Sequence, residues 1–365
     1  MFDHEKLAKL LVNIRYEPLA EKAALAVFKE VTLAGGHAVF QSAPDGVVET
    51  LIELGTDAQL DHLNELAYWC RAKPDVEIII RASANTKALS TVNSERLSRR
   101  MAAQKPTASI FMNRQATGAL RWVLTDFPTE AYAQDFGTSL IQFEDFVSRA
   151  MMLHLDDPIA WWQQFGRWQQ SLIDDLGPNS DRVHLKGPNS DLKMSIKGKT
   201  WDNCACYKNA PDGEFFTGPV PNSVNGWLRM AFPTHYLDHV VEDVYLRFKN
   251  GVIVEATASK GEDFLVKTLN TDRGARRLGE LGIGTKPMVT KPTKQILFDE
   301  KMVGTFHVAA GRGYPNTGNH NKSAVHWDFI VPIGDGTITI DGRPIFKDGD
   351  FVIGDPSLKP AFTWG

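Results

Sequence analysis

Helix-like and strand-like segments alternate along the first half of the chain. Residues 17–33 are rich in Ala, Leu, Lys and Glu and stop before a Gly-Gly pair, which is typical of a helix with glycine at its C-terminal end. Short β-branched or aromatic runs predict buried strands, and they lie at 37–40, 76–80 and 119–124. Further helices are expected at 47–54 and 59–70. This alternation predicts a doubly wound α/β domain.

A helix with a well-defined start lies near the end of this half. Asp157 suits the N-cap position and Pro158 the first helical position, and the helix is expected to extend towards Leu176. The turn-forming string GPNSD follows at 177–181 and recurs at 187–191. These turns predict a domain boundary.

Beyond this boundary the pattern is that of antiparallel strands. Apolar and polar residues alternate with period two at 192–197, and Asn250-Gly251 lies between LRFK and VIVEAT as in a two-residue hairpin. One helix is expected at 262–277. We therefore predict an α/β domain over residues 1–180, covering a cleft, and a β-rich α+β domain over residues 181–365.

Composition agrees with a two-domain globular protein and argues against several functional classes. The chain has 365 residues, of which 43% are hydrophobic and 23% charged. Its net charge of −4 argues against binding to nucleic acid or to a membrane surface. No apolar run approaches the ~20 residues of a membrane helix, and the N-terminus has no secretion signal. With three cysteines, a cytoplasmic protein with reduced thiols is expected.

The candidate metal-binding chemistry is concentrated in a glycine-rich stretch, residues 304–332. His326 and Asp328 are two residues apart in a predicted strand, so both side chains project from one face and together can hold a divalent cation. His307 lies in a second predicted strand, on the face opposite its apolar neighbours. The loop between the strands carries Tyr314 and can bring its phenol close to a ligand.

Two acidic residues lie where the surrounding sequence is apolar or turn-like. Glu214 precedes an aromatic run, and Glu280 is flanked by glycine and leucine in RRLGELGIGT. A buried, unpaired carboxylate costs several kcal/mol or stays protonated, so each is expected to have a cation as its partner. On spacing alone, two readings stay open: a dinuclear metal site, or surface acids combined with hydrogen-bonded core histidines.

Three other histidines are not assigned to the site. His235 and His239 have the spacing of a helical zinc site, but Tyr236 replaces the glutamate of the H-E-x-x-H motif, which favours an ordinary helix face. His320 has polar neighbours and is expected in an exposed loop.

Four blocks in the second half resemble a known family: NAPDGEFFTGPVPNSVNG, LGELGIGT, DEKMVGTFHVAAGRGYPNTG and NKSAVHWD. In this order they are similar to the aminopeptidase T and PepS family of metallo-aminopeptidases, and weaker similarity extends into the first domain. The resemblance implies two divalent ions in the C-terminal domain. By motif position, Glu214 and Asp328 would bind one ion, His307 and His326 the other, and Glu280 would bridge both. Tyr314 matches the catalytic tyrosine of the family.

The resemblance implies a cytoplasmic aminopeptidase, a hydrolase that removes N-terminal residues from peptides by a water activated between two metals. Glu280 could also relay a proton, and Tyr314 could donate a hydrogen bond to the developing oxyanion. Two imidazoles favour zinc or cobalt, while three carboxylates also suit manganese. The implied partners are peptides with a free N-terminus and a second copy of the chain, with neither nucleic acid nor membrane.

Two alternatives remain at this point. One is another dinuclear metallohydrolase, such as an amidase or a phosphoesterase, because mixed sites of histidine and carboxylate serve both chemistries. The other is a non-catalytic, metal-stapled binding protein that has kept the fold.

Overall fold

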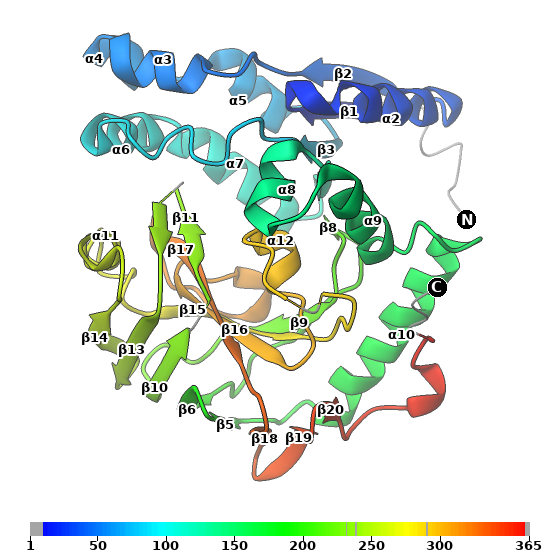
Figure 1. Cartoon of the computed structure of the whole chain (residues 1–365), viewed down its shortest axis with the longest axis vertical. Coiled ribbons are helices and arrows are strands. Elements are labelled where there is room, and N and C mark those ends of the chain that lie inside the picture. The colour runs from blue at the N-terminus through cyan, green and yellow to red at the C-terminus, as the bar shows by residue number, and fades with distance from the viewer. Residues whose placement is uncertain (1–9, 231, 238, 290, 362–365) are drawn as a thin grey trace. The chain divides into compact units, whose positions relative to one another are not determined.

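The chain divides into two compact units (Figure 1). The N-terminal unit extends to Glu144 and takes in Lys208–Ala210, while the C-terminal unit comprises Asp145–Tyr207 and the chain from Pro211 onward. None of the described helices is long and apolar enough to cross a membrane. The computed structural model describes residues 10–230, 232–237, 239–289 and 291–361.

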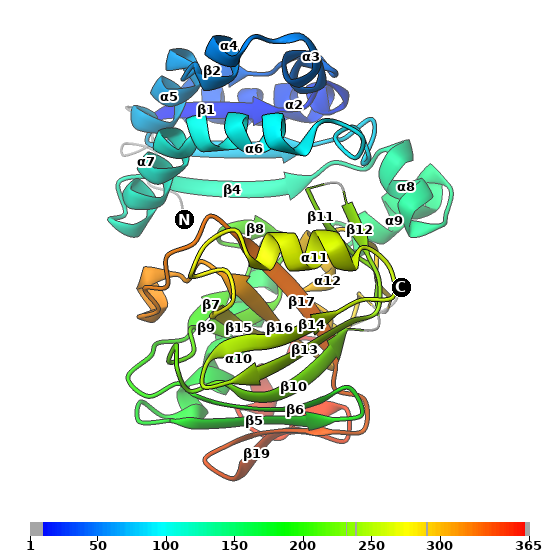
Figure 2. The ribbon, with the colours of Figure 1, turned by 90° about the vertical axis from the view of Figure 1, so that its left-hand side faces the viewer.

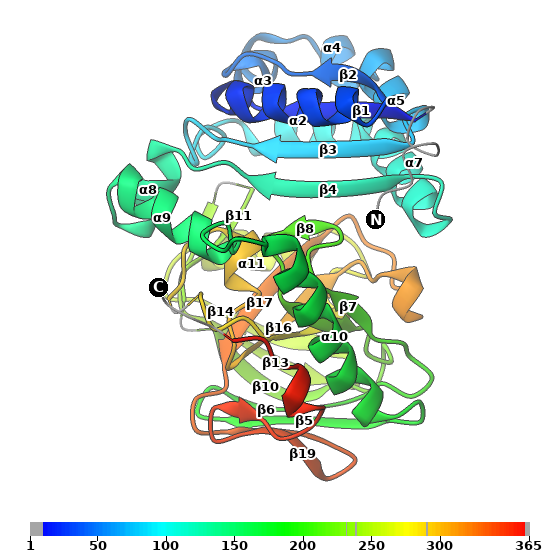
Figure 3. The ribbon, with the colours of Figure 1, turned by 90° about the vertical axis from the view of Figure 1, so that its right-hand side faces the viewer.

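A five-stranded parallel sheet forms the centre of the N-terminal unit, in the order β2-β1-β3-β4-β8. Its strands are β1 (Leu11–Tyr16), β2 (His37–Gln41), β3 (Val76–Arg81), β4 (Arg121–Asp126) and β8 (Asn209–Ala210). The order reverses direction between β1 and β3, as in doubly wound sheets. Helices lie on both faces of the sheet, with α2 on one face and α6 and α7 on the other (Figures 2 and 3). The α/β pattern in the sequence is therefore present as a parallel sheet, and β1 is an additional strand that the pattern had not identified.

The helices of this unit depart from the sequence prediction in one respect that local chemistry explains. The segment expected as one helix at 59–70 forms two, because Asn64 caps the second of them by accepting a hydrogen bond from the Ala67 N–H at 2.9 Å. The helices are η1 (Pro18–Ala20), α2 (Glu21–Leu33), α3 (Val47–Leu54), α4 (Asp57–Asp61), α5 (Glu65–Ala72), α6 (Ser94–Ala103), α7 (Lys105–Ala116) and α8 (Glu130–Phe136), and α9 (Leu140–Ala150) follows across the boundary.

Antiparallel strands dominate the C-terminal unit, as its sequence pattern predicts. An eight-stranded sheet has the order β14-β13-β10-β6-β5-β18-β19-β20, and a five-stranded sheet has the order β17-β16-β15-β9-β7. The larger sheet consists of β5 (Arg182–Gly187), β6 (Ser190–Ser195), β10 (Asn225–Met230), β13 (Val244–Lys249), β14 (Val252–Thr257), β18 (Thr337–Ile340), β19 (Arg343–Lys347) and β20 (Asp350–Phe351). The smaller consists of β7 (Asp202–Cys204), β9 (Glu214–Thr217), β15 (Leu278–Gly284), β16 (Thr305–Gly311) and β17 (His326–Pro332).

The five-stranded sheet forms the interior of this unit. Every residue of β9, β15 and β16 is buried, so both faces of these strands are shielded from water. The remaining elements are short: the hairpin β11 (Thr234–Tyr236) and β12 (His239–Val241), the helices α11 (Glu262–Leu269) and α12 (Ile296–Asp299), and the turns η2 (Pro315–Thr317) and η3 (Pro356–Leu358). A polar side chain on the central strands must therefore find its partner within the protein.

The boundary between the units differs from the one predicted at residue 180. Helix α10 (Pro158–Leu176) starts as expected, with Asp157 accepting a hydrogen bond from the Ala160 N–H, but it belongs to the C-terminal unit. Its aromatic face is buried there, and Trp168 lies 6.1 Å from the ring of Phe351. Burial of this large apolar face places the helix in the C-terminal unit, although the turn-forming sequence that predicted the boundary lies after it.

Two further predictions in this unit have different outcomes. The hairpin at Asn250-Gly251 is present between β13 and β14, and both residues have positive φ (50° and 76°), as a type I′ turn requires. The helix expected at 262–277 is shorter, because α11 ends at Leu269. His235 and His239 lie on the paired strands β11 and β12 rather than on a helix face.

Lys286 is a charged side chain that is completely buried in the C-terminal unit. Its ammonium donates a hydrogen bond to the carbonyl of Ala150 and lies 4.4 Å from the ring centroid of Trp162. Burial disfavours the charged form and lowers the pKa of Lys286 to about 7, despite the opposing effect of Cys206 and Asp212.

Lys286→Met should stabilise the protein more at pH 6 than at pH 9.5. Between about pH 7 and pH 10.5 the unfolded chain binds more protons than the folded one. The free-energy cost of burying the ammonium is therefore largest below pH 7 and becomes smaller as the pH rises. The difference in the free energy of unfolding between variant and wild type should change by roughly 3 kcal/mol between pH 6 and pH 9.5. Denaturant titration at each pH measures it, with the exposed Lys249→Met as control. If the difference in the free energy of unfolding is equal at both pH values, the pKa of Lys286 is not lowered by burial.

Candidate metal centre

Four neighbouring strands of the five-stranded sheet bring all five predicted ligands together. Glu214 begins β9, Glu280 lies in β15, His307 in β16, and His326 and Asp328 in β17. The antiparallel register pairs Glu214 with Gly284, Gly282 with His307, and Ala309 with Asp328. His326 and Asp328 point to the same side, as their spacing predicts.

A glycine makes room for the first histidine. A Cβ atom added to Gly282 would lie 2.0 Å from Cε1 and 2.2 Å from Nε2 of His307. No side chain can occupy that position without displacing the imidazole. Gly282, the second glycine of LGELGIGT, is therefore required by the close approach of His307.

Glu280 lies between the two imidazoles. Its Oε1 is 3.7 Å from Nε2 of His307, and its Oε2 is 3.3 Å from Nε2 of His326. Nε2 of His307 is also 3.2 Å from Oε2 of Glu214, and Nε2 of His326 is 3.8 Å from Oδ1 of Asp328. By these distances Glu214 is next to His307 and Asp328 is next to His326, whereas the family resemblance paired the two histidines. Ligand atoms of Glu280, His307 and Asp328 also lie within 4.8 Å of one another, so the two halves of the cluster are contiguous.

The tautomer of His326 is fixed by the backbone. Nδ1 of His326 lies 2.8 Å from the carbonyl oxygen of Arg312, and because a carbonyl can only accept, Nδ1 carries the proton. When the ring is neutral, Nε2 has its lone pair directed at Glu280 and Asp328, which is the arrangement of a histidine that binds a metal.

Unsatisfied polar atoms provide a direct test of whether these residues fit metal ions. Within the described part of the chain, Oε2 of Glu214, both ring nitrogens of His307 and Oδ1 of Asp328 are buried without a hydrogen-bond partner. Such atoms are rare in folded proteins, and several together indicate an ion. Carboxylate oxygen and imidazole nitrogen are suitable ligands for divalent transition metals.

The electrostatics of the cluster favour bound cations. Burial opposes the charged imidazolium of each histidine, but the carboxylates beside them prevail and raise the pKa of His307 to about 10 and that of His326 to about 9. Burial also disfavours the ionised form of Glu280, yet the two imidazoles that face it hold its pKa well below its usual range. Burial raises the pKa of Glu214 in spite of nearby Lys301. A divalent ion must therefore displace protons from this site.

Sequence reasoning missed three charged residues beside the ligands. Lys301 is completely buried, and its Nζ lies 2.6 Å from Glu214 Oε1, 2.6 Å from Glu300 Oε1 and 3.4 Å from Asp212 Oδ1. Lys301 and Glu300 belong to the block DEKMVGTFHVAAGRGYPNTG, where their proximity to the predicted strand of His307 was the available signal. Asp212 lies in the block NAPDGEFFTGPVPNSVNG, where its position two residues before Glu214 was the corresponding signal.

Tyr314 lies at the edge of the cluster. Its hydroxyl is 3.5 Å from Nε2 of His326, and its ring packs against Phe216 with the centroids 5.2 Å apart. Burial strongly raises the pKa of the phenol, with Glu280 adding to the effect, so the hydroxyl keeps its proton and can donate it. His320 is exposed, as expected from its neighbours.

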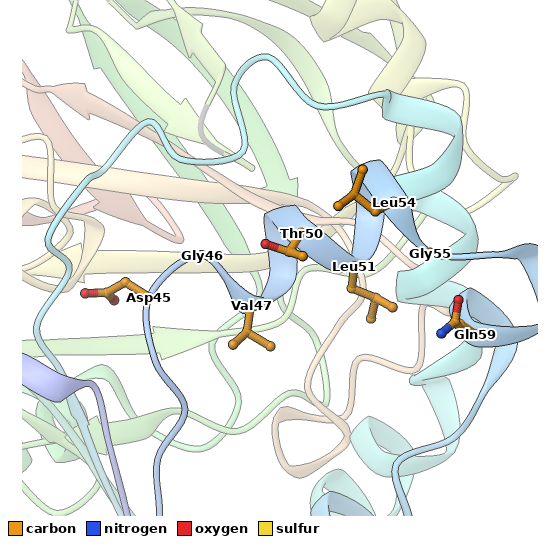
Figure 4. Close-up of a pocket in the computed structure, with 8 residues that line it drawn as sticks. All are labelled: Asp45, Gly46, Val47, Thr50, Leu51, Leu54, Gly55 and Gln59. Carbon is orange, nitrogen blue, oxygen red and sulfur yellow. The ribbon is translucent and has the colours of Figure 1, made fainter.

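Two other features resemble ligand sites. Cys204, Asp212 and Glu214 have ligand atoms within 4.8 Å of one another, and burial raises the pKa of the Cys204 thiol well above its usual value. A metal would have to displace the thiol proton to bind there. A pocket of about 400 Å³ in the N-terminal unit has one ionisable side chain, Asp45, among its lining residues (Figure 4). It therefore lacks the groups needed for hydrolytic chemistry.

Comparison with known proteins identifies the family of this chain. The family described as "Thermophilic metalloprotease (M29)" matches residues 5–351. The chain belongs to this family. The resemblance to aminopeptidase T that the four sequence blocks indicated is confirmed by a relative of that name from Thermus aquaticus, 28% identical over 344 residues, with 83% of each chain covered.

Solved structures show the same fold. Wild-type AmpT from Thermus thermophilus has a TM-score of 0.74 at 24% identity, with 96% of this chain and 99% of that one covered. A 2,5-dihydroxypyridine dioxygenase from Pseudomonas putida KT2440 has a TM-score of 0.59 at 13% identity, covering 94% and 92%. Since the fold is shared with an oxidative enzyme, the residues of the site must decide the chemistry.

Gly282→Ala should release at least one metal ion from this M29 protein. The added methyl group would push His307 away from Glu280 and Glu214, and displaced support of a ligand typically weakens metal affinity about 10- to 100-fold. Atomic emission on protein dialysed against metal-free buffer measures the ion content. Leu281→Val, on the same strand but the opposite face, is the control and should keep its ions. Unchanged metal affinity in Gly282→Ala would contradict the ligand role of His307.

Proposed function

We propose that this chain is a metal-dependent aminopeptidase that removes N-terminal residues from peptides with the help of two divalent ions. The observation that carries the proposal is the position of Glu280, whose two oxygens face two different histidines. A carboxylate in this arrangement can bridge two ions and offset their repulsion. Membership of a metalloprotease family and relatives named as aminopeptidases support peptide hydrolysis.

The proposed ligands are Glu214, Glu280, His307, His326 and Asp328. From the distances, one ion would be held by Glu214 and His307 and the other by His326 and Asp328, with Glu280 shared. When bound, such ions lower the pKa of a water and polarise a carbonyl. Zinc, cobalt and manganese all suit this mixture of nitrogen and oxygen ligands.

The protein side chains would position the substrate and move protons. Glu280 could accept a proton from the attacking water, since its carboxylate lies at the centre of the site between the two imidazoles. Tyr314 keeps its proton and is near enough to donate a hydrogen bond to the oxyanion that forms on the scissile carbonyl. We further propose a cytoplasmic homodimer, on the family resemblance alone, and the covering role of the N-terminal unit stays a prediction.

A phosphoesterase is less well supported, because the cationic side chain nearest the ligands is already engaged. Lys301 is in contact with three carboxylates, so its charge is not available to clamp a phosphate. Amidase chemistry and a non-catalytic role are left as outcomes of the test below.

Activity on a peptide with a free N-terminus should disappear after exhaustive chelation and return with zinc, cobalt or manganese. The measurements are the release of p-nitroaniline from leucine p-nitroanilide and the cleavage of a leucine peptide before and after N-acetylation. Acetylation should abolish turnover, because an aminopeptidase requires the free amine. Undiminished cleavage of the blocked peptide would indicate an amidase or endopeptidase, turnover of p-nitrophenyl phosphate instead would indicate a phosphoesterase, and no turnover with both ions bound would indicate a binding protein.

Tyr314→Phe should retain both ions and nearly the same KM while kcat falls by about 10²–10³-fold, the usual cost of losing one oxyanion donor. The reason is that the hydroxyl would act only when charge develops on the substrate oxygen. Steady-state kinetics with parallel metal analysis checks this. A variant within about twofold of wild type, or one that has lost an ion, would remove Tyr314 from the mechanism.

A further inference from the structure

A pocket of about 630 Å³ in the C-terminal unit is lined by positive charge. Its ionisable lining residues are four cations and one histidine: Lys199, Arg273, Arg277, Lys322 and His320. No acidic residue is among the residues that line it. Because the whole chain has a net charge of −4, this concentration of positive charge is a local feature. A concave surface lined by charges of one sign attracts ions of the opposite sign.

The four cations of this pocket have no carboxylate partner among the described residues. Lys199 and Arg277 each donate a hydrogen bond to a backbone carbonyl only. The exposed side chains of Arg273 and Lys322 form no hydrogen bond or ion pair with any residue that the structure describes. By contrast, arginines of β10 and β13 in the same unit contact carboxylates at 2.5 and 2.7 Å. The positive charge of the pocket is therefore available to a ligand.

The wall that carries two of these cations is held in place by a carboxylate. Asp272 accepts hydrogen bonds of 2.8–3.0 Å from three backbone N–H groups and one hydroxyl, which join segments 272–275 and 323–324. The segments are so close that a Cβ atom on Gly274 would lie 2.1 Å from the carbonyl oxygen of Lys322. Asp272 thus fixes the backbone beside Arg273 and Lys322 without forming an ion pair with either.

The groups in the pocket favour several separate carboxylates over a phosphate or a nucleotide. Phosphate sites commonly offer free backbone N–H groups, but those of Gly274 and Asn321 are already bound to Asp272 and Asn319. Nucleobases commonly stack on aromatic rings, and no Phe, Tyr or Trp lines the pocket. Lysine and arginine side chains around a space of this size suit the carboxylates of acidic side chains.

The pocket shares a loop with Tyr314. Asn321, which lines the pocket, accepts a hydrogen bond of 3.0 Å from the N–H of Gly313, the residue directly before Tyr314. Gly318 also lines the pocket and is four residues beyond Tyr314, so their Cα atoms are at most about 15 Å apart. An extended peptide spans that distance with about four or five residues. Residues downstream of a cleaved N-terminal residue can therefore reach the pocket.

We propose that this cationic pocket binds acidic side chains of peptide substrates, downstream of the bond that is cleaved. The inference rests on the proposed aminopeptidase function and adds a substrate preference to it. The ion pairs form far from the reacting atoms and equally in the ground state and the transition state, so they lower KM and leave kcat unchanged. Each pair with an exposed cation contributes little alone and is weakened by salt.

The kinetic test compares two peptides with the same N-terminal leucine, LAAAEEE and its neutral counterpart LAAAQQQ. In wild-type protein kcat/KM for release of leucine should be about 3- to 30-fold higher for LAAAEEE, mainly through KM, and the preference should disappear in 1 M NaCl. Arg273→Gln/Lys322→Gln should bring the ratio close to one. The matched control, Lys193→Gln/Lys249→Gln, removes two exposed charges outside the pocket and should keep the ratio of wild type.

A binding measurement separates the pocket from turnover. Fluorescence anisotropy with AAAEEE labelled at its N-terminus should show weaker binding to Arg273→Gln/Lys322→Gln than to wild type and the control variant. Equal binding to all three proteins, or a preference for LAAAEEE that persists in the pocket variant, would overturn the proposal. Binding of inorganic phosphate, but not of the labelled peptide, that depends on the pocket would also overturn it. If wild-type protein cleaves neither peptide, the proposed function fails, and the anisotropy result still decides the pocket.

Discussion

The C-terminal unit depends on the mutual compensation of charges that its central sheet buries. Glu214, Glu280 and His307 all lie on strands without access to water, where an ionised group is stable only beside an opposite charge. Lys301 supplies one fixed positive charge, and the two imidazoles supply others when they are protonated. Divalent ions satisfy the same requirement with greater charge, which is why the orphaned oxygen and nitrogen atoms converge at this point.

The backbone of the sheet is adapted to this cluster. Strand β15 carries glycines on both sides of Glu280, and the glycine at 282 leaves the space that His307 occupies. Another glycine, Gly213, has a φ of 134° and lies against the Lys286 side chain, so the turn before Glu214 can pass close to a second buried lysine. Small residues in the strands thus allow large polar side chains to meet between them.

Fold and chemistry are separable in this protein. The architecture is shared with AmpT and with a dioxygenase, so it cannot by itself specify a hydrolytic reaction. The site is distinguished by a carboxylate, Glu280, that faces two histidines, and by the buried Lys301 beside Glu214.

The sequence by itself determined the classes of structure and the residues that are proposed as ligands. Periodicity identified the parallel and antiparallel halves, and the four motif blocks contained all five proposed ligands. His326 and Asp328 share a face because they are two residues apart on a strand. The tertiary structure decided which residues face each other. Helix α10 joined the C-terminal unit because its aromatic face is buried there, and Lys301 reached Asp212 across 89 positions of sequence because the sheet folds them together. Contacts between distant segments depend on strand order and register, which local pattern does not encode.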